Sequence, residues 1–189
     1  AAAAGDGMSD LDRLAIGTVQ WGSEYGIANR TGRPDQHGVR AMIECAVEAG
    51  VDMLDTARAY GEAETVIGRA LRPEDRERFT LVTKVAPDVW MPGMSDHDAL
   101  DRVARSIDQS RRALDSDRLD VVLLHRAAHR TASNGALWEW LCRCVQDGVI
   151  GRLGISAASP GEAVEAVGAP GVEVIQVAAN LLDQRLVHV

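Results

Sequence analysis

The sequence alternates between short, continuous apolar runs and longer segments with helical periodicity. Continuous apolar runs are typical of parallel strands that are buried on both faces. We expect strands at residues 13–19, 51–56, 79–85, 119–125, 151–156 and 172–178. Helical spacing of apolar residues fills 35–49, 98–114 and 135–147, and a further helix start is predicted at 159–162. Strict strand–helix alternation implies right-handed crossovers and a parallel sheet.

This pattern predicts an α/β fold, either a doubly wound sheet or a (β/α)₈ TIM barrel. No GxGxxG motif follows the first predicted strand, which disfavours the dinucleotide-binding form of the doubly wound sheet. No repeat or low-complexity linker interrupts the alternation. We therefore expect one barrel-like domain over residues 11–189, preceded by a disordered leader or expression scar at residues 1–10.

Composition and charge exclude several classes of function. The net charge is −8 without a block of lysines or arginines, which argues against a nucleic-acid partner. No apolar run approaches the ~20 residues of a membrane span, and residues 1–10 lack the features of a signal peptide. The cysteines, Cys45, Cys142 and Cys144, lack zinc-ligand spacing, so we predict no metal site and a reducing, cytoplasmic location.

Polar residues stand where three successive predicted strands end. Asp55 lies near the end of 51–56, with Tyr60 in the loop beyond it, Lys84 near the end of 79–85 and His125 at the end of 119–125. In a barrel, the carboxyl ends of all strands open on one face, where active sites of this fold are built. A charge at the end of a buried strand is costly without a counter-charge, so we expect Asp55 to meet Lys84.

Each of these residues also has an ordinary structural explanation. Asp55 could cap the next helix, Tyr60 could pack in a turn, Lys84 could be a solvated strand end, and His125 could be a core residue with satisfied hydrogen bonds. Their joint placement favours a shared site.

The four side chains together suit proton donation to a carbonyl. A free phenol has a pKa of about 10, which is high for an acid at neutral pH. A neighbouring ammonium stabilises the ionised phenol, and a carboxylate beside that ammonium keeps it charged. An imidazole can hydrogen-bond the carbonyl oxygen. The set predicts a site that polarises C=O and delivers a proton while the carbon accepts a hydride.

At these residues the chain resembles the aldo-keto reductase superfamily. The resemblance runs in family order over nearly the whole chain from Leu14 onward. The matching segments are LAIGTVQWG (14–22), YGIANRTG (25–32), LDTARAYGEAETVIGRAL (54–71), VTKV (82–85), LDVVLLH (119–125), GVIGRLGIS (148–156) and IQVAANLLDQR (175–185). YGIANRTG and NLLDQR are similar to a bacterial subgroup that is often associated with surface-polysaccharide or secondary-metabolite biosynthesis.

The resemblance implies a (β/α)₈ barrel that reduces a small carbonyl compound with NADPH, or with NADH as the alternative. It implies Tyr60 as general acid, Lys84 as its partner, Asp55 as counter-ion of the lysine and His125 as the group that orients the carbonyl. For the cofactor it implies contacts from Gly17, Thr18, Asp55, Ser156 and Gln176.

The resemblance also points to substrate-pocket walls at Trp21 and Trp90, in the loops after the first and third strands, and more weakly at His129. Packing of these tryptophans against the barrel rim is the alternative. One departure concerns the cofactor, because many members of the family have asparagine where this chain has Ala157. A carboxamide contact is then lost or made by another residue.

A second departure is length, because a typical barrel needs roughly 250 residues. The 189 residues suffice for about six of eight β/α units, so we expect an incomplete barrel that is truncated, split or completed by another polypeptide. Its open edges leave two alternatives, self-association or pairing with a completing chain. Two rival functions remain at this point. One is a redox-inactive scaffold or subunit, and the other is a lyase or dehydratase that uses the same four residues without hydride transfer.

Overall fold

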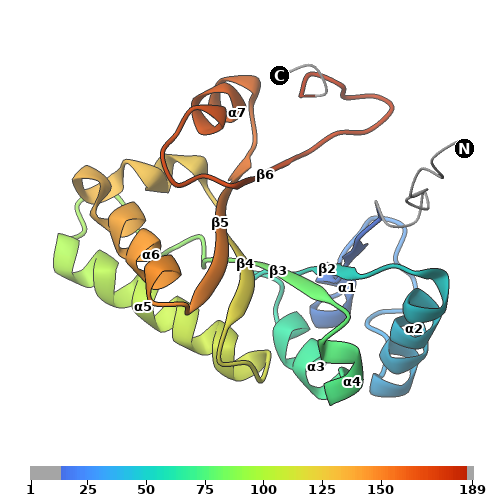
Figure 1. The fold of residues 1–189 in the computed structure, drawn as a ribbon. Coiled ribbons are helices and arrows are strands. Elements are labelled where there is room, and N and C mark those ends of the chain that lie inside the picture. The colour runs from blue at the N-terminus through green and yellow to red at the C-terminus, as the bar shows by residue number, and fades with distance from the viewer. Residues whose placement is uncertain (1–13, 187–189) are drawn as a thin grey trace, which may run out of the picture.

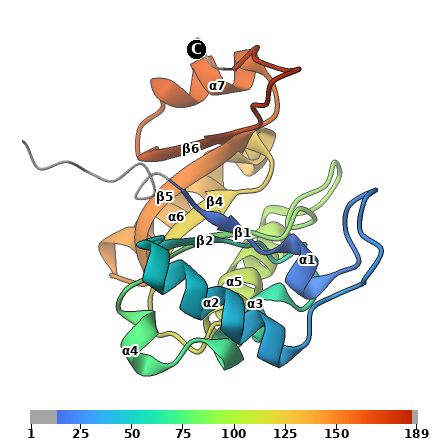
Figure 2. The ribbon, with the colours of Figure 1, turned by 90° about the vertical axis from the view of Figure 1, so that its right-hand side faces the viewer.

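The computed structural model describes residues 14–186, so the predicted leader at residues 1–10 lies outside the described residues. Its six strands form one parallel sheet in sequence order. The strands are β1 (Ile16–Gly17), β2 (Met53–Asp55), β3 (Thr80–Lys84), β4 (Leu119–Leu124), β5 (Ile150–Ala157) and β6 (Val174–Val177). Figures 1 and 2 show that this sheet is curled and that helices cover its outer side. The fold is the predicted incomplete (β/α)₈ barrel, with six of its eight strands present.

Helices connect the strands, and those in 35–49, 98–114, 135–147 and from 159 onward are the ones that the sequence predicts. The α-helices are α1 (Val19–Gly22), α2 (Gln36–Ala49), α3 (Ala63–Ala70), α4 (Pro73–Arg76), α5 (Asp96–Ala113), α6 (Ala136–Gln146) and α7 (Pro160–Val167), and 3-10 turns span η2 (Ala127–Arg130) and η3 (Ala132–Gly135). Three of the four predicted helix starts have capping side chains: Asp35, Ser95 and Ser159 accept backbone hydrogen bonds at the starts of α2, α5 and α7. Gly50 ends α2 in the left-handed conformation, which glycine adopts readily.

The two faces of the sheet bury different clusters. Side chains alternate between faces along a strand, and the outward ones pack with the helices in the main core, where Leu54, Leu81 and Leu153 lie with Ile67 and Leu141. The inner face carries a smaller apolar cluster: Val82, Val121 and Leu123, with Met53 and Val174 packed against them. Burial on both faces explains why the strands appear in the sequence as continuous apolar runs.

The first strand is shorter than predicted. The sequence predicts 13–19, whereas β1 covers Ile16–Gly17 and α1 begins at Val19. The strand ends early because the backbone of Thr18, the N-cap of α1, leaves the extended conformation (φ −106°, ψ 8°). The N–H and the hydroxyl of Thr18 both donate to the carbonyl of Asp55, each at 2.9 Å. The chain is thereby fastened to the end of β2 and turns into the helix.

Candidate active site

Lys84 is the centre of a polar cluster at the carboxyl ends of the strands. Its Nζ donates to both carboxylate oxygens of Asp55, at 2.7 and 2.9 Å, and to the carbonyl of Thr56 at 3.0 Å. The hydroxyl of Tyr60 lies 3.4 Å from the same nitrogen, and that nitrogen sits 4.9 Å from the centre of the Tyr60 ring. Lys84 is only 2% exposed, so the Asp55 carboxylate is the counter-charge that its burial requires.

These contacts decide against the ordinary explanations of three residues. Asp55 does not cap the next helix, because the N-cap of α3 is Glu62. Lys84 is not a solvated strand end. Tyr60 is half-buried in a turn, but its hydroxyl faces the ammonium. The predicted meeting of Asp55 with Lys84, and of Lys84 with Tyr60, is present in the structure.

His125 follows the last residue of β4 and lies beside Tyr60. The two rings meet edge to face with their centres 6.3 Å apart. Burial lowers the pKa of His125 below its ordinary value of 6.5, and the positive charges of Lys84 and Arg126 lower it further. The imidazole is therefore neutral at neutral pH. Its Nδ1 is buried without a hydrogen-bond partner among the described residues, so His125 is not the satisfied core histidine of the alternative explanation.

Gln176 reaches the cluster from β6. Its Nε2 donates to the Asp55 Oδ1 at 2.9 Å. Ser156 on β5 is the register partner of Gln176, and both side chains are half-buried. The contact between Gln176 and Asp55 joins strands that are not neighbours in the sheet, and it was not predicted from the sequence.

The remaining predicted cofactor residues flank the end of β1. Gly17 is exposed, and a Cβ placed there would meet nothing within 4 Å. Thr18 is fully buried, and its hydroxyl donates a hydrogen bond to the carbonyl of Asp55, which links the end of β1 to β2. Ala157 is buried with Ala163 and Leu186, so no polar side chain takes the place of the asparagine at that position.

The two tryptophans have different surroundings. Trp21 is not in a loop as predicted: it belongs to α1 and is 4% exposed within the main core. Trp90 is half-buried after β3, and its ring meets that of His129 edge-on at 6.1 Å. Burial lowers the pKa of His129 as well, with a further contribution from Arg126. Trp90 and His129 thus pack on each other, and their contact with substrate stays a prediction.

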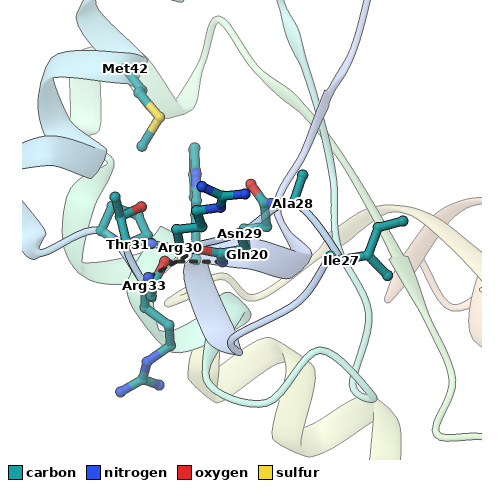
Figure 3. A pocket seen from close by; sticks show the side chains of 12 residues that line it. Gln20, Ile27, Ala28, Asn29, Arg30, Thr31, Arg33 and Met42 are labelled. Atoms are coloured by element: carbon teal, nitrogen blue, oxygen red, sulfur yellow. Dashed lines mark hydrogen bonds between the residues drawn. The ribbon is translucent and has the colours of Figure 1, made fainter.

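A pocket of about 710 Å³ lies outside the cluster (Figure 3). The segment after α1 encloses most of it, with Met42 of α2 and Gln20 and Trp21 of α1 on its walls. Asn29 holds this segment by hydrogen bonds to Tyr25, Thr31 and Gly32. None of Asp55, Tyr60, Lys84 or His125 lines the pocket. Among residues 14–186, no group of three or more His, Cys, Asp or Glu could hold a metal ion.

Comparison with known proteins assigns the chain to a family. The model of the family described as "Aldo/keto reductase family" matches residues 13–188. The chain belongs to this family.

None of the helices described within residues 14–186 has the length and apolar character that a membrane span needs.

Relatives of this aldo-keto reductase chain include enzymes from plants and bacteria. It is 23% identical over 172 residues to a chloroplastic pyridoxal reductase of Arabidopsis thaliana, covering 84% of this chain and 45% of that protein. It is 27% identical over 118 residues to an aldo-keto reductase of Bacillus subtilis, covering 61% of this chain and 33% of that protein. The chain therefore spans less than half the length of these relatives.

Solved structures resemble it over a larger share. A protein from Pseudomonas aeruginosa assigned as an aldo-keto reductase superposes with a TM-score of 0.77 at 26% identity, covering 93% of this chain and 66% of that one. An aldo-keto reductase from Bacillus halodurans gives 0.71 at 23% identity, covering 93% and 56%. The second comparison supports the fold alone.

Proposed function

We propose that this aldo-keto reductase chain carries the proton-donating site of an oxidoreductase that reduces an aldehyde, ketone or sugar-derived carbonyl to an alcohol. NADPH is the proposed reductant, with NADH as the alternative, in a cytoplasmic setting. The observation that carries the proposal is the position of the Lys84 ammonium, which contacts the Asp55 carboxylate and the Tyr60 hydroxyl at once.

Tyr60 is the proposed general acid. When its hydroxyl gives a proton to the carbonyl oxygen of a substrate, negative charge appears on the phenol oxygen. The Lys84 ammonium, 3.4 Å away and shielded from water, stabilises that charge. Asp55 holds the ammonium in place through two hydrogen bonds.

His125 is proposed to orient the carbonyl. Its lowered pKa leaves a neutral imidazole, which carries one N–H donor and one acceptor nitrogen. The edge-to-face contact with Tyr60 places the imidazole beside the phenol, so that one substrate oxygen can meet both groups. Because the imidazole is neutral, it does not repel the nearby ammonium of Lys84.

The residues present fit the nicotinamide end of the cofactor. Gln176 and Ser156 offer amide and hydroxyl groups on adjacent strands, next to Asp55, and Gly17 leaves open space at the end of β1. These residues would hold the nicotinamide and its ribose. The bound cofactor supplies the hydride, while the residues of this chain orient the carbonyl and deliver the proton.

The test compares the two tyrosines of the chain. Consumption of NADPH is measured with a panel of aldehydes, ketones and sugar-derived carbonyls. Tyr60→Phe is expected to lower turnover by about 10²- to 10⁴-fold, the usual contribution of a general acid. Tyr25→Phe, at a side chain that is 60% exposed, should leave turnover unchanged.

Three results would contradict the proposal. They are full turnover by Tyr60→Phe, turnover that continues after nicotinamide is removed, and absence of binding of both NADPH and NADH in isothermal titration calorimetry. The second would indicate a lyase or dehydratase, and the third a scaffold.

A further inference from the structure

We propose that Glu64 is a positioning residue that fixes Tyr60 relative to Lys84 from behind the site. The expected effect of Glu64 on kcat rests on the proposed carbonyl reduction, whereas its expected effect on the position of the Tyr60 ring does not. Glu64 lies in the first turn of α3 and is 1% exposed, so a carboxylate is buried here without facing the opening of the site.

The carboxylate of Glu64 bonds to the two segments that carry the proposed catalytic pair. Its Oε1 accepts a hydrogen bond from the hydroxyl of Thr83 at 2.6 Å. Its Oε2 pairs with the guanidinium of Arg58. Thr83 directly precedes Lys84 on β3, and Arg58 lies two residues before Tyr60 in the loop after β2. Glu64 therefore joins the strand of the lysine to the loop of the tyrosine.

The backbone completes the same connection. The N–H of Arg58 donates to the carbonyl of Lys84 at 3.2 Å. Because successive side chains of a strand point to opposite faces, Thr83 and Lys84 extend to opposite sides of β3. Glu64 thus acts from the outer side of the strand, while the ammonium of Lys84 stands on the inner side. It supports the geometry of the site without touching substrate.

Few other side-chain contacts would hold the guanidinium of Arg58 once Glu64 loses its charge. The guanidinium has one further side-chain contact among the described residues, a long one of 3.5 Å to Gln109. It is 23% exposed, so it can turn toward water. Removing the charge of Glu64 therefore frees the Arg58 side chain and leaves the backbone bond from Arg58 to Lys84 as the connection between the loop and β3.

The first test is kinetic. Glu64→Gln is expected to lower kcat about 10- to 100-fold, because a displacement of ~1 Å at reacting groups can cost about 10² in rate. The KM for the carbonyl should change little, since Glu64 makes no contact with the open side of the site. Arg58→Leu combined with Glu64→Leu should restore stability, as apolar replacements of buried ion pairs often do, without restoring kcat.

The second test needs no turnover. The ring protons of His125 lie beside the Tyr60 ring, so their NMR chemical shifts report the position of that ring. The chain has five histidines, and the spectrum of His125→Gln assigns the resonance. Glu64→Gln is expected to move the His125 ring resonances. Thr83→Val, which removes one of the two contacts, should move them less and serves if Glu64→Gln does not fold.

Asp75→Asn is the matched control. Asp75 is also a buried carboxylate, 6% exposed and paired with Arg40, but it lies on α4 away from the tyrosine loop. It should lower stability and leave both kcat and the His125 resonances unchanged. The inference is overturned if folded Glu64→Gln and Thr83→Val keep the wild-type His125 resonances, or if Asp75→Asn moves them as far. A wild-type chain without reductase activity, in which Glu64→Gln still moves the resonances, refutes the proposed function and supports the positioning role.

Discussion

The ion pair between Asp55 and Lys84 allows a quantitative prediction about stability. Asp55→Asn removes the counter-charge of the buried Lys84 ammonium and leaves it only neutral acceptors, which are the new amide oxygen, the Thr56 carbonyl and the Tyr60 hydroxyl. Loss of one partner of a buried pair costs about 3–5 kcal/mol. The Asp55 side chain is 18% exposed, so water can reach part of the site. We therefore expect a loss of about 3 kcal/mol of unfolding free energy, at the low end of that range.

A double-mutant cycle separates the pair from its surroundings. Lys84→Met should cost only about 1–2 kcal/mol, because Asp55 keeps its bond from Gln176 and some contact with water. The double variant should be close to Lys84→Met in stability, since no unpaired ammonium remains. The magnitude of the coupling energy between the two positions then equals the cost of Asp55→Asn, about 3 kcal/mol, at the top of the range for residues in contact.

Urea unfolding at neutral pH measures these values, with the fluorescence of the four tryptophans as the signal. Coincidence with far-UV circular dichroism checks the two-state assumption. Asp117→Asn is the control, because Asp117 is fully exposed and stands 3.7 Å from Arg111, and it should leave stability unchanged. A coupling energy below about 0.5 kcal/mol, the usual error of additivity for independent sites, would show that the buried pair does not form in solution.

Three further predictions concern parts of the chain around this pair. Burial lowers the pKa of His129 below 6.5, so at acidic pH the unfolded chain binds a proton that the folded chain does not. The stability of the fold should therefore decrease as the pH drops below about 6.5. The midpoint of thermal unfolding of His129→Gln should depend less on pH than that of the wild type. Gly61→Ala should cost more than about 2 kcal/mol in urea unfolding, because φ is +59° and the new Cβ would lie 2.4 Å from the Gly22 carbonyl oxygen, whereas Gly17→Ala should be tolerated in the same assay. Ser159→Ala should cost about 1 kcal/mol and raise amide hydrogen exchange in α7, and unchanged exchange there would contradict a capping role.

The convergence of Asp55, Lys84 and His125 could be predicted because it depends on topology. Parallel strands in sequence order bring their carboxyl ends to one face, so a polar residue at each end is enough to place the group. The contact of Gln176 with Asp55 could not be predicted in this way. It depends on how tightly the sheet curls, and strand periodicity carries no information on curvature.

The burial of Glu64 and the helical position of Trp21 could not be predicted from the sequence for a different reason. A glutamate in the first turn of a helix is usually explained by the helix dipole and by exposure to water, so its burial against Thr83 has no signature in the pattern. Helix α3 itself could have been predicted, because Ala63, Ile67 and Ala70 repeat at helical spacing on its buried side. Trp21 lies in a single-turn helix, which is too short for periodicity to detect.

The bond from Gln176 to Asp55 spans the hollow of the curled sheet, from its last strand to its second. Flattening the sheet would separate β6 from β2 and stretch this bond before any backbone pairing between neighbouring strands is lost. The carboxylate that anchors Lys84 is thus mechanically linked to the bend of the whole scaffold. A change in that bend would reach the Lys84 ammonium through one amide group.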